Sequence, residues 1–185
     1  FKEGVLQDGV IEKCAAFAAR EHGDARRALD LLRIAGELAE RTGSKKVLLK
    51  HIDEANGKIE RDKILDVVKS EPKQFQLVLY SIIQLSEKRK NPQTTLGKNK
   101  GEKNNSLFTG DVYNYYEELC RKYKLEVLTQ RRVSDIVQEF DMLGVINVRV
   151  ISKGRGGRMR EIKLAISNNI IDKIKEIIKE SLDYN

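Results

Sequence analysis

Apolar residues in the first seventy positions recur every three or four residues, the spacing of one buried helix face. Three stretches show this pattern: 8–21, 25–41 and 50–69. Gly57 could bend or break the third stretch, because glycine is a poor helix former. We predict a small helical bundle over residues 1–70, with the domain boundary next to Pro72, since proline disfavours helix in the residue before it.

The pattern after Pro72 begins with helices and then changes its period. Helical spacing predicts helices at 73–90, 111–124, 129–143 and 170–182. Apolar and polar residues alternate over 145–151 and 160–166, which predicts two β-strands, and the glycines between them permit the turn of a hairpin. Helices followed by a hairpin are typical of a winged helix-turn-helix domain. We therefore expect a mainly α protein with this domain at 71–185.

Positive charge is concentrated in the second part of the chain. The whole sequence carries a net charge of +7, of which residues 1–69 contribute +1 and residues 70–185 contribute +6. Such an excess in one domain is typical of a protein that binds a polyanion, because lysine and arginine neutralise phosphates and release counterions. Lys98, Lys100 and Lys103 fall in a polar segment that we expect to be a solvated loop with only auxiliary contacts.

Other classes of protein receive no support from the sequence. No apolar run approaches the roughly 18 residues of a membrane span, and the first residues show no signal-peptide pattern. Cys14 and Cys120 are too far apart for a redox motif, and neither His22 nor His51 lies at metal-ligand spacing. We expect a cytoplasmic, nucleoid-associated fragment of a longer protein, with no membrane partner, metal site or catalytic residue.

The third helix of the second domain is the candidate DNA-recognition helix. Its apolar residues predict one buried face, which leaves a polar face after Thr129 at the helix start: Gln130, Arg131, Arg132, Ser134, Asp135 and Gln138. Such a helix fits the major groove, where arginine pairs with guanine edges and glutamine with adenine edges. Alternatively, Arg131 could pair with Asp135, four residues further on, at a merely solvated surface.

The hairpin turn is the second candidate DNA contact. Its residues are mostly basic or glycine: Lys153, Gly154, Arg155, Gly156, Gly157, Arg158 and Arg160. Four cations around one turn repel each other, and two strands could be joined without them, so their grouping favours contact with phosphates or the minor groove. Tyr113, Tyr115 and Tyr116 lie on a predicted helix and are expected to pack there rather than to stack on bases.

A run in the first domain provides a resemblance to a known family. Residues 23–37, with the pattern Gly-Asp-x-Arg-x-Ala-Leu-Asp, resemble the sensor-2 helix in the lid domain of AAA+ ATPases. The run is most similar to archaeal replication initiators related to the eukaryotic origin-recognition complex, as are residues 47–62 and the junction near Pro72. The resemblance implies a lid followed by an origin-binding winged helix. It also implies that Arg26 contacts nucleotide phosphates, although Arg26 could instead pair with Asp24 or Asp30.

The phosphate-binding loop of an ATPase is not found in this sequence. No Gly-x-x-x-x-Gly-Lys-Ser/Thr run occurs, nor an apolar strand that ends in paired acids. We therefore expect this segment to hold no cofactor and not to hydrolyse ATP by itself. The resemblance implies that a full-length parent binds ATP or ADP with Mg²⁺.

The leading hypothesis is sequence-specific binding of double-stranded DNA at replication origins, as part of a DNA replication initiator. Other initiator subunits and the replicative helicase are further candidate partners. One alternative is a winged-helix transcriptional regulator with a helical dimerisation domain, which palindromic half-sites would favour. Another is a protein-binding adaptor whose basic wing meets an acidic surface, which failure to bind any duplex would favour.

Overall fold

The computed structural model describes residues 1–20, 23–90, 106–152 and 158–183, and only the backbone of Arg158. It separates the chain into two compact units, 1–63 and 64–185, with the boundary inside helix α3 (Leu49–Ser70). Seven helices and one small sheet in the described part confirm the predicted mainly α fold class. The predicted functional division at residues 70 and 71 stays a prediction. None of the described helices combines the length and apolarity that a membrane span requires.

The first unit is built from three helices whose apolar residues pack together. They are α1 (Val10–Arg20), α2 (Ala25–Arg41) and the first part of α3. The buried cluster comprises Val10, Cys14, Leu31, Ile34, Ala35, Ala39, Val47, Ile52 and Ala55. The Val47 N–H donates to the Val5 carbonyl at 2.9 Å, which ties the segment before α3 to the N-terminal residues. Helix α3 is continuous through Gly57, so the glycine does not break it.

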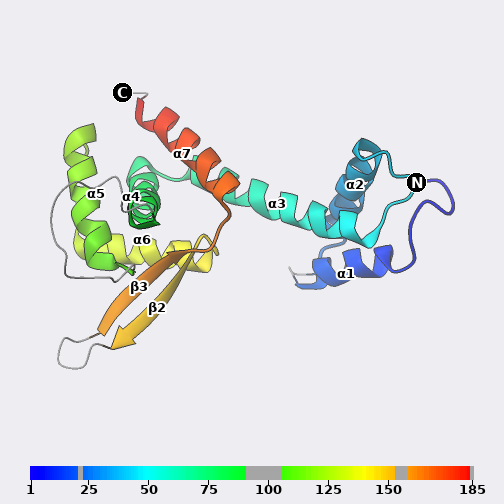
Figure 1. Ribbon diagram of the computed structural model, residues 1–185, viewed down its shortest axis with the longest axis horizontal. Helices are drawn as coiled ribbons and strands as arrows, with labels where there is room; N and C mark the ends of the chain where they lie inside the picture. The colour runs from blue at the N-terminus through cyan, green and yellow to red at the C-terminus, as the bar shows by residue number, and fades with distance from the viewer. Residues whose placement is uncertain (21–22, 91–105, 153–157, 184–185) are drawn as a thin grey trace. The chain divides into compact units, whose positions relative to one another are not determined.

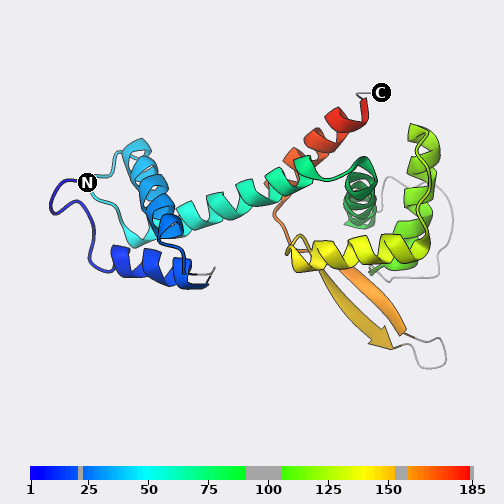
Figure 2. The same cartoon turned by 180° about the vertical axis from the view of Figure 1, so that it is seen from behind.

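The second unit has the last residues of α3, four further helices and a small sheet around one core (Figures 1 and 2). The helices are α4 (Lys73–Lys90), α5 (Thr109–Tyr123), α6 (Gln130–Met142) and α7 (Asn168–Asp183). Helix α4 contacts each of the other three. The rings of Phe75 on α4 and Phe140 on α6 have their centroids 4.3 Å apart. Helix α4 therefore forms the centre on which the DNA-recognition candidate α6 is packed.

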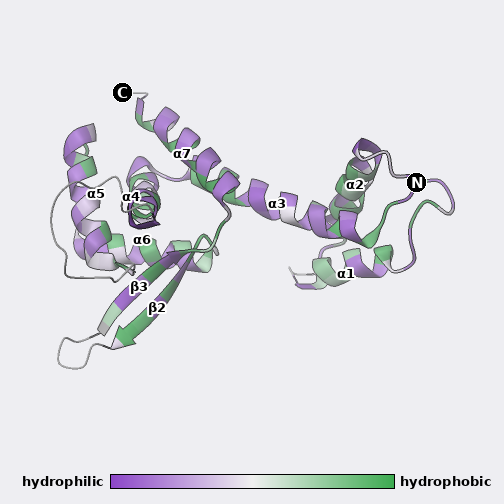
Figure 3. Ribbon diagram, in the orientation of Figure 1, coloured by the Kyte–Doolittle hydropathy of each residue, from purple (hydrophilic) through white to green (hydrophobic). Residues whose placement is uncertain are grey.

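The sheet has three antiparallel strands in the order β1-β3-β2, with bounds Leu107–Phe108 for β1, Ile146–Ser152 for β2 and Arg158–Leu164 for β3. Strands β2 and β3 pair from Ile146 opposite Leu164 to Ser152 opposite Arg158, which confirms the predicted hairpin. Both views show this hairpin projecting from the helices of its unit (Figures 1 and 2). Apolar and polar residues occur on both strands, as the alternating pattern requires (Figure 3).

The start of α5 differs from the sequence prediction. A short strand, β1, precedes the helix, and Leu107 pairs with Ile162 of β3. The helix begins at Thr109 rather than at Asp111, because the Asp111 carboxylate accepts a hydrogen bond from the Phe108 N–H at 3.0 Å. The Asp111 side chain thus satisfies a backbone N–H at the start of the helix.

Glu161 is the one acidic residue in the sequence of the basic segment 149–163, and it is 8% exposed. The Ser106 hydroxyl donates to its carboxylate, the Lys163 ammonium lies 3.7 Å away, and Arg149 is its cross-strand neighbour. The Ser106 hydrogen bond, followed by the positive charge of Lys163 and Arg149, lowers the pKa of Glu161 below its ordinary value near 4.5. The fold therefore favours the ionised carboxylate.

A carboxylate with a lowered pKa stabilises the fold above its ordinary pKa, and this contribution is lost as the pH falls. We predict that Glu161→Gln reduces the loss of thermal stability between about pH 6 and about pH 3, because the variant has no such carboxylate to protonate. Thermal unfolding followed by circular dichroism at each pH measures this difference. If the melting temperatures of the wild type and the variant fell equally with pH, the prediction would be contradicted.

Candidate nucleic-acid interface

The buried face of α6 determines which of its residues are exposed. Val133, Ile136, Val137 and Phe140 face the core and are at most 2% exposed. At the helix start, the Thr129 hydroxyl accepts a hydrogen bond from the Arg132 N–H at 3.3 Å, so Thr129 is the N-cap. Both observations agree with an amphipathic helix that presents a polar face to solvent.

The predicted polar residues of α6 do lie on its solvent side. Gln130, Arg131, Arg132, Asp135 and Gln138 are exposed, and Ser134 is half-buried. Arg132 is 3.2 Å from the Glu139 carboxylate, whereas Arg131 has no ion pair with any residue in the described ranges, Asp135 included. The alternative of an Arg131–Asp135 pair is therefore not what the structure has. The Arg131 guanidinium is free to bind an anion or a base edge.

A groove of about 460 Å³ lies along this face. Three elements form it: α6 with Gln130, Arg131, Ser134 and Asp135, the start of α5 with Thr109 and Gly110, and β3 with Met159 and Arg160. The N-terminus of α5 carries backbone N–H groups and the positive end of the helix dipole. The groove thus combines two arginines and a helix N-terminus with the Asp135 carboxylate, and this excess of positive charge suits a negatively charged backbone.

A second, smaller groove separates α6 from the hairpin. Gln138 lines it together with Val150 and Arg160, and Arg160 also lines the first groove. The Asp141 carboxylate accepts a hydrogen bond from the Val148 N–H at 2.8 Å, which fixes β2 to the last turn of α6. Arg160 is exposed and has no ion-pair partner in the part of the chain that the structure describes. The hairpin therefore places a cation next to the helix.

Most of the predicted wing residues lie outside the described residues, namely Lys153, Gly154, Arg155, Gly156 and Gly157, as does the side chain of Arg158. Lys98, Lys100 and Lys103 lie outside them as well. The described strands end at Ser152 and begin again at Arg158, which are paired with each other. The wing contact stays a prediction that rests on the sequence of the turn.

Sequence reasoning missed the contribution of α5 and of Met159 to the groove. Thr109 and Gly110 lie just before the helix predicted at 111–124, and Met159 lies just before the strand predicted at 160–166, so none of the three was assigned to the interface. Met159 follows Arg158 at the start of β3, so its place could have been derived from the strand register. The approach of the α5 start to α6 could not, because it depends on how the helices pack.

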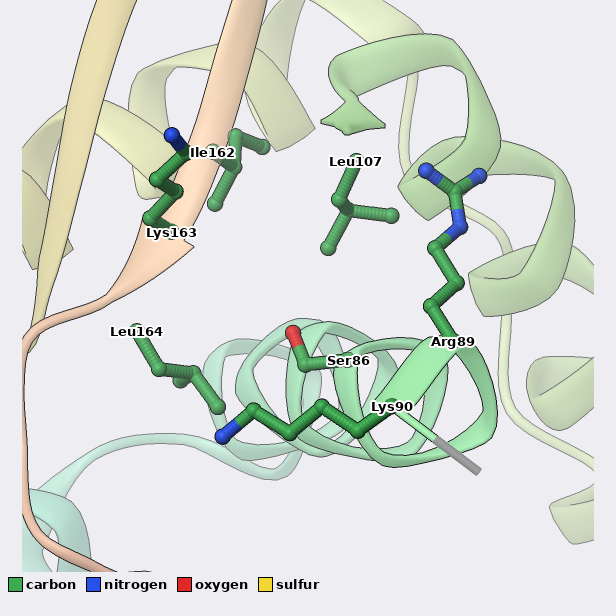
Figure 4. A pocket seen from close by; sticks show the side chains of 7 residues that line it. All are labelled: Ser86, Arg89, Lys90, Leu107, Ile162, Lys163 and Leu164. Atoms are coloured by element: carbon green, nitrogen blue, oxygen red, sulfur yellow. The ribbon is translucent and has the colours of Figure 1, made fainter. Parts of the chain in front are cut away.

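A pocket of about 310 Å³ at the sheet edge is separate from this surface (Figure 4). Its side chains come from α4, β1 and β3: Ser86, Arg89, Lys90, Leu107, Ile162, Lys163 and Leu164. Arg89 is 2.8 Å from the Asp111 carboxylate, and Lys163 is 3.7 Å from that of Glu161. No predicted site residue lines this pocket, and its charged groups are partly neutralised.

The first unit contains the other predicted site residue, Arg26. It lies in the first turn of α2, where its backbone N–H donates to the Asp24 carboxylate at 2.9 Å. Its exposed guanidinium has no ion pair within the described ranges. Asp30, the other candidate partner, lies 3.6 Å from Arg33. The next residue, Arg27, is half-buried and lies 2.7 Å from Glu60 of α3. Of the two neighbouring arginines, Arg26 is the one available to a ligand.

Among the residues that the structure describes, potential metal ligands are scattered rather than grouped. Within the described residues, no three His, Cys, Asp or Glu side chains come together in a way that could hold a metal ion. Cys14 and Cys120 are buried free thiols, and burial raises the pKa of each. A raised pKa keeps a thiol protonated and unreactive.

Two family models match the chain. Residues 1–57 match the Cdc6 AAA+ ATPase-type lid domain, and residues 98–174 match the CDC6 C-terminal winged helix domain. The two matches lie in the order lid, then winged helix, that the resemblance implied.

Relatives with the same domains are similar over nearly the whole chain. The ORC1-type DNA replication protein of Pyrococcus furiosus is 49% identical over 185 residues, which are 100% of this chain and 40% of that protein. Its counterpart in Thermococcus onnurineus is 52% identical over 167 residues, 90% of this chain and 37% of that protein. The Aeropyrum pernix ORC1 protein, solved in complex with DNA, has 42% sequence identity and a TM-score of 0.73 over 97% of this chain and 42% of its own. The chain thus spans about two fifths of its relatives.

Proposed function

Because this chain belongs to the ORC1/Cdc6 family of AAA+ DNA replication proteins, with the lid and winged helix domains of that family, we propose that it binds double-stranded DNA at replication origins. The contact surface is α6 together with the β2–β3 hairpin. The observation that carries this proposal is the groove in which Arg131 and Arg160, both without an ion-pair partner among the described residues, meet the N-terminus of α5. The A. pernix ORC1 protein bound to DNA supports it.

Helix α6 is proposed to enter the major groove with its N-terminal end first. Arg131 can donate two parallel hydrogen bonds to a guanine edge, Gln130 or Gln138 can pair with adenine, and the Asp135 carboxylate can accept from the cytosine amino group. These side chains occupy the exposed face of α6. Sequence preference would therefore arise from α6.

The hairpin and the start of α5 are proposed to contact the DNA backbone. Arg160 lies beside α6, and the turn sequence adds Lys153, Arg155 and Arg158. Phosphates are bound by arginine and lysine and by the free N–H groups of a helix N-terminus, and such contacts orient a protein on the duplex without reading bases. Insertion of the wing into a narrow minor groove would place the same arginines in a region of enhanced negative potential.

The first unit is proposed to serve nucleotide control in an intact ORC1-type protein that contains this segment. Arg26 fits that role, because its guanidinium is exposed and without an ion-pair partner within the described ranges. A guanidinium binds phosphate oxygens through a planar set of donors. ATP or ADP with Mg²⁺ would supply the phosphates, and the rest of the protein would supply the remaining ligands. Other initiator subunits and the helicase are proposed partners of that intact protein.

We predict that the wing contributes phosphate contacts that depend on salt. Replacing Arg155 and Arg158 together with Ala should weaken duplex binding and reduce the slope of log K against log salt by about 2, because each lost phosphate contact reduces it by about one. Fluorescence anisotropy at several salt concentrations measures the slope. An unchanged slope would show that the wing does not contact phosphates. Binding to no duplex at moderate salt would favour the protein-binding adaptor.

Arg131 should contribute to base discrimination. We predict that Arg131→Ala reduces the preference for a duplex selected from a random pool over its shuffled version by about 1–3 kcal/mol, because a paired guanine edge loses its partner. Lys179→Ala is the control, since Lys179 is an exposed cation on α7 that lines neither groove. Equal effects of the two substitutions would contradict base readout by Arg131.

Arg26 should affect nucleotide turnover without affecting DNA binding. We predict that Arg26→Ala impairs ATP turnover in an intact ORC1-type protein, whereas the 185-residue chain with the same change binds duplex as before. Arg33→Ala is the matched control, because Arg33 is exposed on the same helix but paired with Asp30 and Glu37. An equal loss of duplex binding in the 185-residue chain would overturn this division of roles.

A further inference from the structure

We propose that Gln74 of α4 and Tyr116 of α5 are positioning residues for DNA recognition, because together they fix the turn that precedes α6. This inference rests on the proposed function of α6. Neither side chain touches the groove that contains Arg131 and Arg160. Both act through the backbone of the turn between α5 and α6.

The turn comprises residues 124–129 and contains no helix or strand. Leu128, directly before the N-cap Thr129, has both of its backbone groups bound to tyrosines of α5. Its N–H donates to the Tyr116 hydroxyl oxygen at 3.2 Å, and its carbonyl accepts from the Tyr113 hydroxyl at 3.3 Å. The beginning of α6 is therefore held by side chains of the preceding helix.

Gln74 extends this network to α4. Its side-chain nitrogen donates to the Glu126 carbonyl, and its side-chain oxygen accepts from the Tyr116 hydroxyl. A side-chain amide has a donor nitrogen and an acceptor oxygen at the same end, which is what bridging these two groups requires. Gln74 thus links three elements: α4, α5 and the turn.

Tyr116 is fully buried, and burial raises the pKa of its phenol, so the hydroxyl keeps its proton. As a donor to Gln74 and an acceptor from Leu128, the hydroxyl uses both of its capacities. A phenylalanine would fill the same space but would leave the half-buried Leu128 N–H without its acceptor and the Gln74 amide oxygen with only the Cys120 thiol, at 3.8 Å, as a donor. Losing these hydrogen bonds is costly in a protein interior. The hydroxyl, rather than the ring, carries the positioning role.

The hydrogen bonds of Gln74 and Tyr116 restrict the orientation of α6 more than apolar packing does. Helix α4 also contacts α6 through Phe75 and Phe140, near the other end of α6. Apolar contacts tolerate small rotations and shifts, whereas hydrogen bonds are directional. The network therefore sets the rotation of α6 about its axis and its position along that axis at the first turn, where Gln130 and Arg131 lie. Hydrogen bonds to base edges require this accurate placement, whereas contacts to the DNA phosphates require it less.

The test compares specific with non-specific binding in the 185-residue chain. The wild type first selects a duplex from a random pool, and affinities are then measured for this duplex and its shuffled version. We expect Tyr116→Phe to reduce the ratio of the two affinities about tenfold, with the salt slope unchanged, because phosphate contacts are retained. Gln74→Met, which removes both amide bonds at a half-buried position, should have the same effect and covers the case that Tyr116→Phe fails to fold.

Ser81→Ala is the matched control. Ser81 is also fully buried in this unit, and its hydroxyl donates to the Leu77 carbonyl at 2.8 Å within α4, away from the turn. We expect Ser81→Ala to change thermal stability but not the affinity ratio. An equal loss of discrimination in Ser81→Ala, or full discrimination in Gln74→Met, would overturn the positioning role. A wild type that selects no sequence would instead refute the proposed function.

Discussion

The packing of one face of α6 against α4 determines what the second unit presents to solvent. Val133, Ile136, Val137 and Phe140 are buried together, and removing this stripe from water is the main source of stabilisation for the helix. A helix with one buried face must expose the other. The polar row from Gln130 to Gln138 is exposed for this reason and needs no separate cause.

The distribution of ion pairs then decides where positive charge is available. Around the sheet and α5, two acids are engaged: Asp111 with Arg89, and Glu161 with Ser106 and Lys163. On α6, Glu139 engages Arg132. Arg131 and Arg160 have no such partner among the described residues, and both line the same groove. The groove therefore holds two arginines without an ion-pair partner among the described residues, next to the Asp135 carboxylate.

The sequence predicted the helices and the hairpin well, because their periodicities are local properties. It did not predict β1, since a two-residue strand has no periodicity and forms only because Leu107 meets Ile162. The exposed face of α6 was predicted from its apolar stripe. The groove was not, because it needs the start of α5 beside β3, and that depends on packing between residues far apart in the chain. The same holds for the bridge between Gln74 and Tyr116, which lie 42 residues apart.

Arg26 and Arg27 show why residue type alone does not assign a role. They are neighbours with the same chemistry, and a helix turns by about 100° per residue, so they face different surroundings. Arg27 points toward α3, where Glu60 and Asn56 bind it at 2.7 and 3.0 Å, and it joins two helices of the first unit. Arg26 is exposed instead, and only its backbone N–H is bound, to Asp24. Removing Arg27 would break a structural contact, whereas removing Arg26 would leave this unit intact. A guanidinium that makes no contact within the fold is the one that can bind a ligand without loss of stability.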